Sequence, residues 1–264
     1  MNLIDIGANL THDSFSDDRD EVINRAAENG VKQMVLTGAR EEGSHKALAL
    51  AKTRPGILFS TAGVHPHHAA EYTVDVDKAL RALLIDDAVV AVGECGLDYF
   101  RDFSPRDAQR EAFDQQLEIA VDLELPVFLH QRDAHDDFVE QLTPQLKKIT
   151  RAVAHCFTGT EAQLKTYLDM GLYIGITGWI CDERRGAHLH DIVHLIPDDK
   201  LMIETDAPYL MPRTLTPKPA TRRNEPAYLI EVLRVVADAR NQSVQDVAAY
   251  TTATAIKFFG IPNI

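Results

Sequence analysis

The chain has 264 residues, of which 45% are hydrophobic, and its formal net charge at neutral pH is −13. This length suits one α/β barrel, although it would also allow two smaller domains. The acidic balance argues against tight, non-specific binding of duplex nucleic acid, because such binding normally uses a basic surface. It does not exclude an enzyme that holds a few phosphates in a pocket, where local charge matters more than the total.

The sequence lacks the features of membrane and exported proteins. No apolar run reaches the length of a membrane span. The N-terminal residues MNLIDIGANLTHD have no basic region and turn acidic at once, unlike a signal peptide. The three cysteines are widely spaced and odd in number, which argues against a disulfide framework. We therefore expect a cytoplasmic protein that does not associate with membranes.

Short apolar runs alternate with helical patterns along the whole chain. Brief β-branched runs are typical of buried strands, and the first helical pattern has an acidic start and a glycine stop. Each predicted strand is followed by a predicted helix, in the order 3–7 and 18–30, 32–38 and 41–56, 57–66 and 74–87, 89–98 and 106–124, 126–130 and 134–148, 151–159 and 160–171, 172–178 and 186–197, 201–206 and 226–240. A last helix is predicted over 245–260, and Pro144 is expected to kink or divide the helix of 134–148.

This order of elements predicts the fold class. Steady alternation of strands and helices implies a parallel sheet. Eight such units in a chain of this length predict a closed TIM (β/α)8 barrel, in a single domain over residues 1–264. A doubly wound open sheet is the alternative.

Four of the apolar runs end in side chains that bind metal ions. The runs VVAVGE, PVFLH, RAVAH and LMIETD end at Glu94, His130, His155 and Asp206. A lone histidine at a strand end is more often structural, but in a barrel the C-terminal ends of the strands meet on one face. We therefore predict a metal site there. Imidazole and carboxylate ligands suit zinc, manganese or iron better than calcium. Magnesium also fits if carboxylates and substrate phosphates carry most of the binding.

Basic residues follow the last two predicted strands. The segment PYLMPRTLTPKPATRRNEP comes after Asp206, and CDERRG follows the seventh strand. Barrels often hold phosphate near this point, which predicts phosphate contacts from Arg184, Arg185, Arg213, Arg222 and Arg223. The alternative is a solvated loop whose arginines pair with nearby acids. Aromatic residues after the strand ends either stack on unpaired bases or pack locally; they are Tyr99, Phe100, Trp179 and Tyr209.

Five motifs carry a resemblance to a known family. VGECGLD, FLHQRDA, AHCFTG, GVHPH and IETDAPYL together resemble the TatD family of metal-dependent hydrolases, and they occur in the family's order. The resemblance implies a TIM barrel, a divalent metal and 3′-to-5′ exonuclease action on single-stranded DNA and RNA, in DNA repair or degradation. It also implies roles for five residues: Glu94, His130 and His155 as metal ligands, Asp206 as a ligand or the acid/base, and His65 as a phosphate contact.

One segment departs from the family pattern. The wider family begins with Asp-x-His-x-His, whose histidines serve one metal of a pair, whereas this chain has Gly7 and Asn9 at those positions after Asp5. Glycine offers no ligand, and the asparagine carbonyl is a poor substitute for imidazole. This sequence therefore predicts one firmly held ion and a second that is held weakly.

The expected chemistry is metal-assisted phosphodiester hydrolysis, with Glu94 and Asp206 as the catalytic carboxylates. No G-x-S-x-G elbow or reactive cysteine supports a covalent mechanism. We expect Mg²⁺ first, with Mn²⁺ or Zn²⁺ as alternatives, and a monomer without an obligate protein partner. Two rival functions use the same ligands: an amidohydrolase acting on a small amide or lactone, and a metal-binding scaffold without activity.

Overall fold

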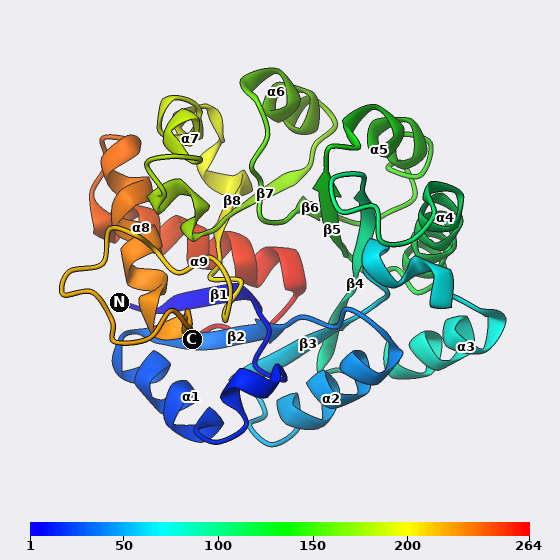
Figure 1. Cartoon of the computed structure of the whole chain (residues 1–264), viewed down its shortest axis with the longest axis horizontal. Helices are drawn as coiled ribbons and strands as arrows, with labels where there is room; N and C mark the ends of the chain where they lie inside the picture. The colour runs from blue at the N-terminus through cyan, green and yellow to red at the C-terminus, as the bar shows by residue number, and fades with distance from the viewer. The chain divides into compact units, whose positions relative to one another are not determined.

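The computed structural model describes residues 1–264 and contains the eight predicted strand-helix units (Figure 1). The strands are β1 (Leu3–Ala8), β2 (Val31–Leu36), β3 (Leu58–Ala62), β4 (Val89–Asp98), β5 (Val127–Arg132), β6 (Ala152–Ala154), β7 (Tyr173–Ile176) and β8 (Leu201–Ile203). The helices are α1 (Arg19–Glu28), α2 (Glu41–Ala51), α3 (Val74–Leu83), α4 (Arg106–Asp122), α5 (His135–Leu142), α6 (Glu161–Asp169), α7 (Ala187–Ile192), α8 (Leu229–Ala239) and α9 (Val244–Phe259). Strand order in the sheet follows chain order, from β1 to β8.

The strand β4 ends at Asp98, as predicted, so Glu94 lies inside the strand and not at its end. Other element ends differ from those predicted. β5 continues past His130 to Arg132, because Cys95–Asp98 pair with Leu129–Arg132. β8 ends before Asp206, which follows the strand by three residues. The helix over 134–148 is shorter than predicted, because α5 ends at Leu142 and Pro144 follows that end instead of kinking the helix.

The chain forms two compact units that interleave in the sequence. The first unit comprises residues 1–35, 156–165 and 174–264, and the second comprises residues 36–155 and 166–173. The prediction of one domain over residues 1–264 stays a prediction.

The second unit is built on the parallel strands β3, β4, β5 and β6. The register places Gly96 beside His130 and Leu129 beside Ala154. Helix α2 packs on β3 and helix α4 packs on β4 (Figure 1). The rings of Phe113 in α4 and Phe138 in α5 stack with centroids 5.6 Å apart, and both side chains are fully buried. This apolar layer fixes β4 and β5, the strands that carry Glu94 and His130.

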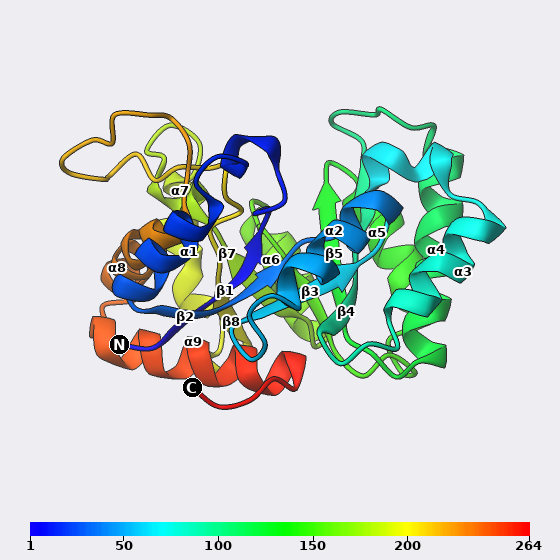
Figure 2. The same cartoon turned by 90° about the horizontal axis from the view of Figure 1, so that it is seen from below.

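The first unit contains the parallel pair β7 and β8, strand β1 and the helices α8 and α9. Helix α9 packs against β1, β8 and α8 (Figure 2). It begins where the Ser243 hydroxyl accepts a hydrogen bond from the Asp246 amide at 3.0 Å, and it ends at Gly260, whose φ of 68° suits glycine. None of the helices combines the length and apolar character needed to cross a bilayer.

Candidate metal centre

Two glycines in β4 allow the close approach that positions Glu94. Gly93 and Gly96 have φ values of 131° and 138°, which disfavour other residues. A Cβ atom would lie 2.2 Å from the Phe128 carbonyl oxygen at position 93, and 2.0 Å from the His130 carbonyl oxygen at position 96. The β4–β5 register is irregular between Val92 and Cys95, on either side of Glu94. Glycine at both positions therefore lets β4 lie tightly against β5.

Three histidines surround one oxygen of Glu94. Its Oε1 atom lies 2.7 Å from His155 Nε2, 3.0 Å from His130 Nδ1 and 3.3 Å from His65 Nε2. The donor atoms of His65, Glu94 and His130 lie within 4.8 Å of one another, which is the arrangement of a group that can hold a metal ion. The second unit thus brings together three of the four predicted ligands and the predicted phosphate contact, His65.

Asp98 and His67 also belong to this cluster, and our sequence analysis did not assign them a role. Asp98 Oδ2 lies 2.8 Å from His67 Nε2 and 3.3 Å from His130 Nε2. Its Oδ1 accepts hydrogen bonds from the amides of Phe100 and Arg101, at 3.0 and 2.8 Å. Alternation along a strand would have found Asp98, because residues four apart share a face. A carboxylate behind a metal-binding histidine fixes the orientation of its ring.

The charges in the cluster are strongly coupled. Burial raises the pKa of the Glu94 carboxyl, but the charges and hydrogen bonds of its histidine neighbours outweigh burial and hold this pKa well below its ordinary value. Burial opposes the charging of His130, yet its hydrogen bonds to Asp98 and Glu94 leave its pKa raised. For His65, burial dominates and lowers the pKa to about 4. Burial also raises the pKa of Asp98, but hydrogen bonds with His130 and His67 outweigh it and hold this pKa below its ordinary value. Glu94 and Asp98 are therefore ionised at neutral pH, and His65 is a neutral imidazole.

The hydrogen bonds of His65 define its tautomer. Its Nδ1 atom accepts from the His67 amide at 3.1 Å, so the single proton of the neutral ring is on Nε2. Nε2 is the nitrogen that faces Glu94, and it is therefore a hydrogen-bond donor. A protonated nitrogen cannot bind a metal ion, although its position is within reach of one. This tautomer suits the donation of a hydrogen bond to an anionic oxygen.

Asp206 lies in the first unit. Its Oδ1 accepts a hydrogen bond from the Asn9 side-chain amide at 2.9 Å, and its backbone amide donates to the Gly7 carbonyl at 2.8 Å. The residues at the two missing histidine positions thus hold Asp206. Asp5 is fully buried and accepts a 2.9 Å hydrogen bond from the Thr205 amide. That Asp206 binds the same metal as Glu94 stays a prediction.

The first unit also contains a pocket of about 460 Å³ that is rich in arginine. The pocket is lined by nine residues: Gly178, Trp179, Asp182, Arg184, Arg185, Leu210, Met211, Arg213 and Arg222. Four of the five predicted phosphate-binding arginines are in this set, and the fifth, Arg223, is not.

Carboxylates pair with most of these arginines. Buried Asp182 lies 2.9 Å from both Arg184 Nη2 and Arg185 Nε, and Arg213 Nη2 lies 2.9 Å from Glu183. Arg223 pairs with two carboxylates outside the pocket, Asp18 at 2.6 Å and Glu225 at 2.7 Å. These ion pairs correspond to the alternative of arginines paired with nearby acids, and phosphate binding stays a prediction.

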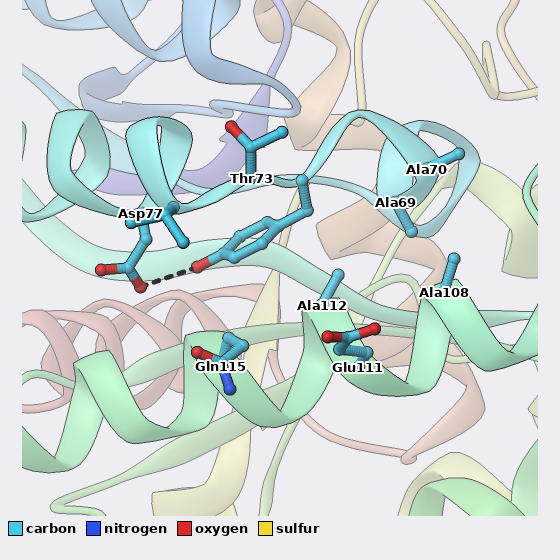
Figure 3. A pocket seen from close by; sticks show the side chains of 10 residues that line it. Ala69, Ala70, Thr73, Asp77, Ala108, Glu111, Ala112 and Gln115 are labelled. Carbon is cyan, nitrogen blue, oxygen red and sulfur yellow. Dashed lines mark hydrogen bonds between the residues drawn. The ribbon is translucent and has the colours of Figure 1, made fainter.

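A second pocket, of about 500 Å³, lies between α3 and α4 in the second unit (Figure 3). Alanines 69, 70, 108 and 112 form much of its wall, and the Tyr72 hydroxyl donates a hydrogen bond to Asp77 Oδ2 at 3.1 Å. None of the predicted site residues lines this pocket.

Solved structures with the same architecture define the class of protein. A TatD homologue from Escherichia coli K12 superposes with a TM-score of 0.89 at 28% identity, over 98% of each chain. A TatD-family hydrolase from Entamoeba histolytica gives a TM-score of 0.90 at 26% identity, over 99% of each chain. A phosphotriesterase homology protein from E. coli shares the fold, with a TM-score of 0.68 at 14% identity, over 98% of each chain. The predicted fold is confirmed: the protein is a TIM (β/α)8 barrel of the metal-dependent hydrolase type.

Sequence comparison identifies the family. The family model "TatD related DNase" matches residues 4–260. A protein from Citrobacter rodentium is 52% identical over 259 residues, and one from Salmonella typhimurium is 50% identical over 259 residues, in both cases over 98% of this chain and at least 98% of the relative. Both relatives are named 3′-5′ ssDNA/RNA exonuclease TatD. The chain belongs to the TatD-related DNase family, as its motifs predicted.

Proposed function

We propose that this protein is a metal-dependent 3′-to-5′ exonuclease that hydrolyses phosphodiester bonds in single-stranded DNA and RNA. The observation that carries the proposal is the set of three imidazole nitrogens within 3.3 Å of Glu94 Oε1. Its support is the full-length identity of about half to relatives named for this activity. We also propose a role in DNA repair or degradation. We expect the protein to act in the cytoplasm and as a monomer.

The donor set fits a divalent cation. Two imidazoles and a carboxylate that is ionised at neutral pH converge from β4, β5 and the end of β6. A divalent cation between these nitrogen and oxygen donors would stabilise their close packing. We propose Glu94, His130 and His155 as ligands, with Asp206 completing the set. When bound, the ion polarises a phosphoryl oxygen and lowers the pKa of a bound water. Mg²⁺ is our first choice, with Mn²⁺ or Zn²⁺ as alternatives.

The chain's own residues then have separate tasks. Asp206 is the proposed base that takes a proton from the attacking water, since it is a carboxylate held in place by the Asn9 amide at 2.9 Å. Glu94 is the second proposed catalytic carboxylate, and its negative charge interacts with the ligand histidines. His65 Nε2–H donates a hydrogen bond to a phosphate oxygen, which its tautomer supports. Asp98 orients His130 so that Nδ1 faces Glu94.

The arginine-rich pocket is the proposed binding site for further phosphates of the strand. Arg222 lines this pocket, and we propose it as the first contact with an incoming phosphate. To bind Arg184, Arg185 or Arg213, a phosphate has to displace the carboxylates of Asp182 and Glu183 or bind the arginines together with them. Arg223 remains a predicted contact whose pairing with Asp18 and Glu225 has to be broken first.

The number of tightly held ions tests the ligand set. Gly7 offers no ligand and the Asn9 amide donates to Asp206, so we expect one firmly bound divalent ion per chain. Metal analysis after dialysis measures this number. Two equivalents per chain, retained through dialysis, would contradict the prediction.

Digestion of end-labelled strands tests the function. A 5′-labelled single strand should yield a ladder that shortens from the 3′ end, and a 3′-labelled strand should release a labelled mononucleotide first. Reactions with Mg²⁺ and with Mn²⁺ identify the better cofactor, and a chelator should stop both. For variants of the site histidines, such as His130→Ala, His45→Ala is the matched control, because His45 is exposed on α2. Cleavage of a small amide or lactone without release of mononucleotides would favour the amidohydrolase.

A further inference from the structure

The loop of residues 99–105, between β4 and α4, presents two phenylalanines to solvent. Phe100 is 53% exposed and Phe103 is 68% exposed. Single exposed apolar side chains are common on protein surfaces, but two large ones on the same short loop, here called the phenylalanine patch, are a candidate binding surface.

Hydrogen bonds hold this loop at both ends. The Gln109 side-chain amide in α4 donates to the Asp98 carbonyl at 3.2 Å and to the Ser104 carbonyl at 2.9 Å. The Ser104 hydroxyl donates to the His67 carbonyl at 3.0 Å. Exposure of the phenylalanines therefore does not come from a loose loop. A preorganised apolar surface binds a partner at a lower cost in conformational entropy.

The patch is continuous with the candidate metal centre. The Phe103 ring centroid lies 4.8 Å from that of His67, which lies 4.2 Å from that of His65. His65 in turn contacts Glu94 at 3.3 Å. At the other phenylalanine, the Arg132 guanidinium lies 3.8 Å from the Phe100 ring centroid. An anionic strand whose phosphodiester is held at His65 and Glu94 therefore has flat apolar faces and a cation close by.

We propose that Phe100 and Phe103 form a stacking subsite for unpaired nucleobases of the substrate strand. The inference rests on the nuclease function proposed above and extends it to a specific contact. Every nucleobase has a π-face, so aromatic stacking binds single strands with little regard to sequence. Bases inside a duplex already stack on their neighbours and offer no free face. The subsite thus gives the enzyme a preference for single strands without base-specific hydrogen bonds.

A cycle of protein and substrate changes tests the subsite. The variants are Phe103→Ala and the double variant Phe100→Ala with Phe103→Ala, compared with Val74→Ala, which removes an apolar side chain that is 72% exposed on α3. The substrates are a single strand and the same strand with abasic nucleotides at its last three positions. Metal-dependent digestion gives kcat and KM, and fluorescence anisotropy with metal-free protein gives strand affinity.

Phe103→Ala should raise KM and weaken binding of the normal strand by about tenfold, the effect of one base stack. Wild type should lose at least that factor on the abasic strand, about as much as the double variant loses on the normal strand, and Phe103→Ala should cause no further loss there. Val74→Ala should behave as wild type. Equal losses on both strands, unchanged KM, or a changed oligomeric state in place of a changed KM would overturn the subsite while the nuclease function stands. Failure of wild type to bind or digest any strand would overturn both.

Discussion

Replacing Asp98 by asparagine should weaken metal binding while leaving the fold intact. Asp98 Oδ2 accepts from His130 Nε2, so that a bound metal ion can take the place of the proton on His130 Nδ1, which faces Glu94. An asparagine keeps Oδ1, and with it the hydrogen bonds from the amides of Phe100 and Arg101. Its amide nitrogen, however, donates where the carboxylate accepted. His130 then carries its proton on Nδ1, the nitrogen that we propose as the ligand.

Two estimates of the size of this effect agree. Loss of a carboxylate behind a metal-binding histidine typically lowers metal affinity or activity by about 10- to 100-fold. That range corresponds to about 1.4–2.8 kcal/mol, since each factor of ten is worth about 1.4 kcal/mol. A hydrogen bond to a charged group contributes about 1.5–3 kcal/mol. Solvent screening reduces neither value, because Asp98 is 1% exposed.

Metal titration provides the assay. Calorimetric titration of metal-free protein with Mn²⁺ should show a dissociation constant about 10- to 100-fold higher for Asp98→Asn than for wild type. Circular dichroism without metal should show a folded protein, and the stabilisation by added metal in thermal unfolding should shrink. Asp102→Asn is the matched control, because Asp102 lies on the loop that follows Asp98 and pairs with Arg106 at the surface. Wild-type metal affinity in Asp98→Asn would refute the orienting role and the assignment of His130 Nδ1 as a ligand.

Three further predictions follow from the site and its surroundings. Glu94→Ala, His130→Ala and His155→Ala should each abolish hydrolysis while circular dichroism shows a folded protein, because these side chains do not form the apolar core; near-wild-type activity in any one would refute its role. Single strands should be digested faster than blunt duplex at the same salt, since so acidic a chain cannot separate strands through backbone contacts; equal rates would remove this argument. Burial raises the pKa of Asp5 to about 7, so the folded state binds a proton that the unfolded state releases above its ordinary pKa of 3.8. The free energy of unfolding should fall as pH rises through this window, and Asp5→Asn should flatten that fall in urea unfolding at pH 5 to 8; an unchanged slope would show that Asp5 is not the group responsible.

The sequence by itself determined the fold, because the fold depends on local patterns repeated along the chain. Each strand-helix unit has its own apolar run and its own stop signal, and eight such units leave few other arrangements. The same reasoning singled out Glu94, His130 and His155, which the structure brings together, since a polar side chain after a buried apolar run is conspicuous. It placed the end of β5 too early, because continued pairing of Gln131 and Arg132 with β4 does not require an apolar run.

Only the tertiary structure decided how the polar groups are paired. Whether Asp98 contacts His130 depends on the register of β4 against β5, to which Gly93 and Gly96 contribute through close approach. Likewise, the sequence could not show that His65 carries its proton on Nε2, because that follows from a hydrogen bond with its own turn. Arginines in a basic segment look equally available in a sequence, yet folding pairs four of the five with carboxylates: Arg184, Arg185, Arg213 and Arg223. A pattern reports burial, which is local, whereas hydrogen bonds and ion pairs join atoms whose separation only the folded chain determines.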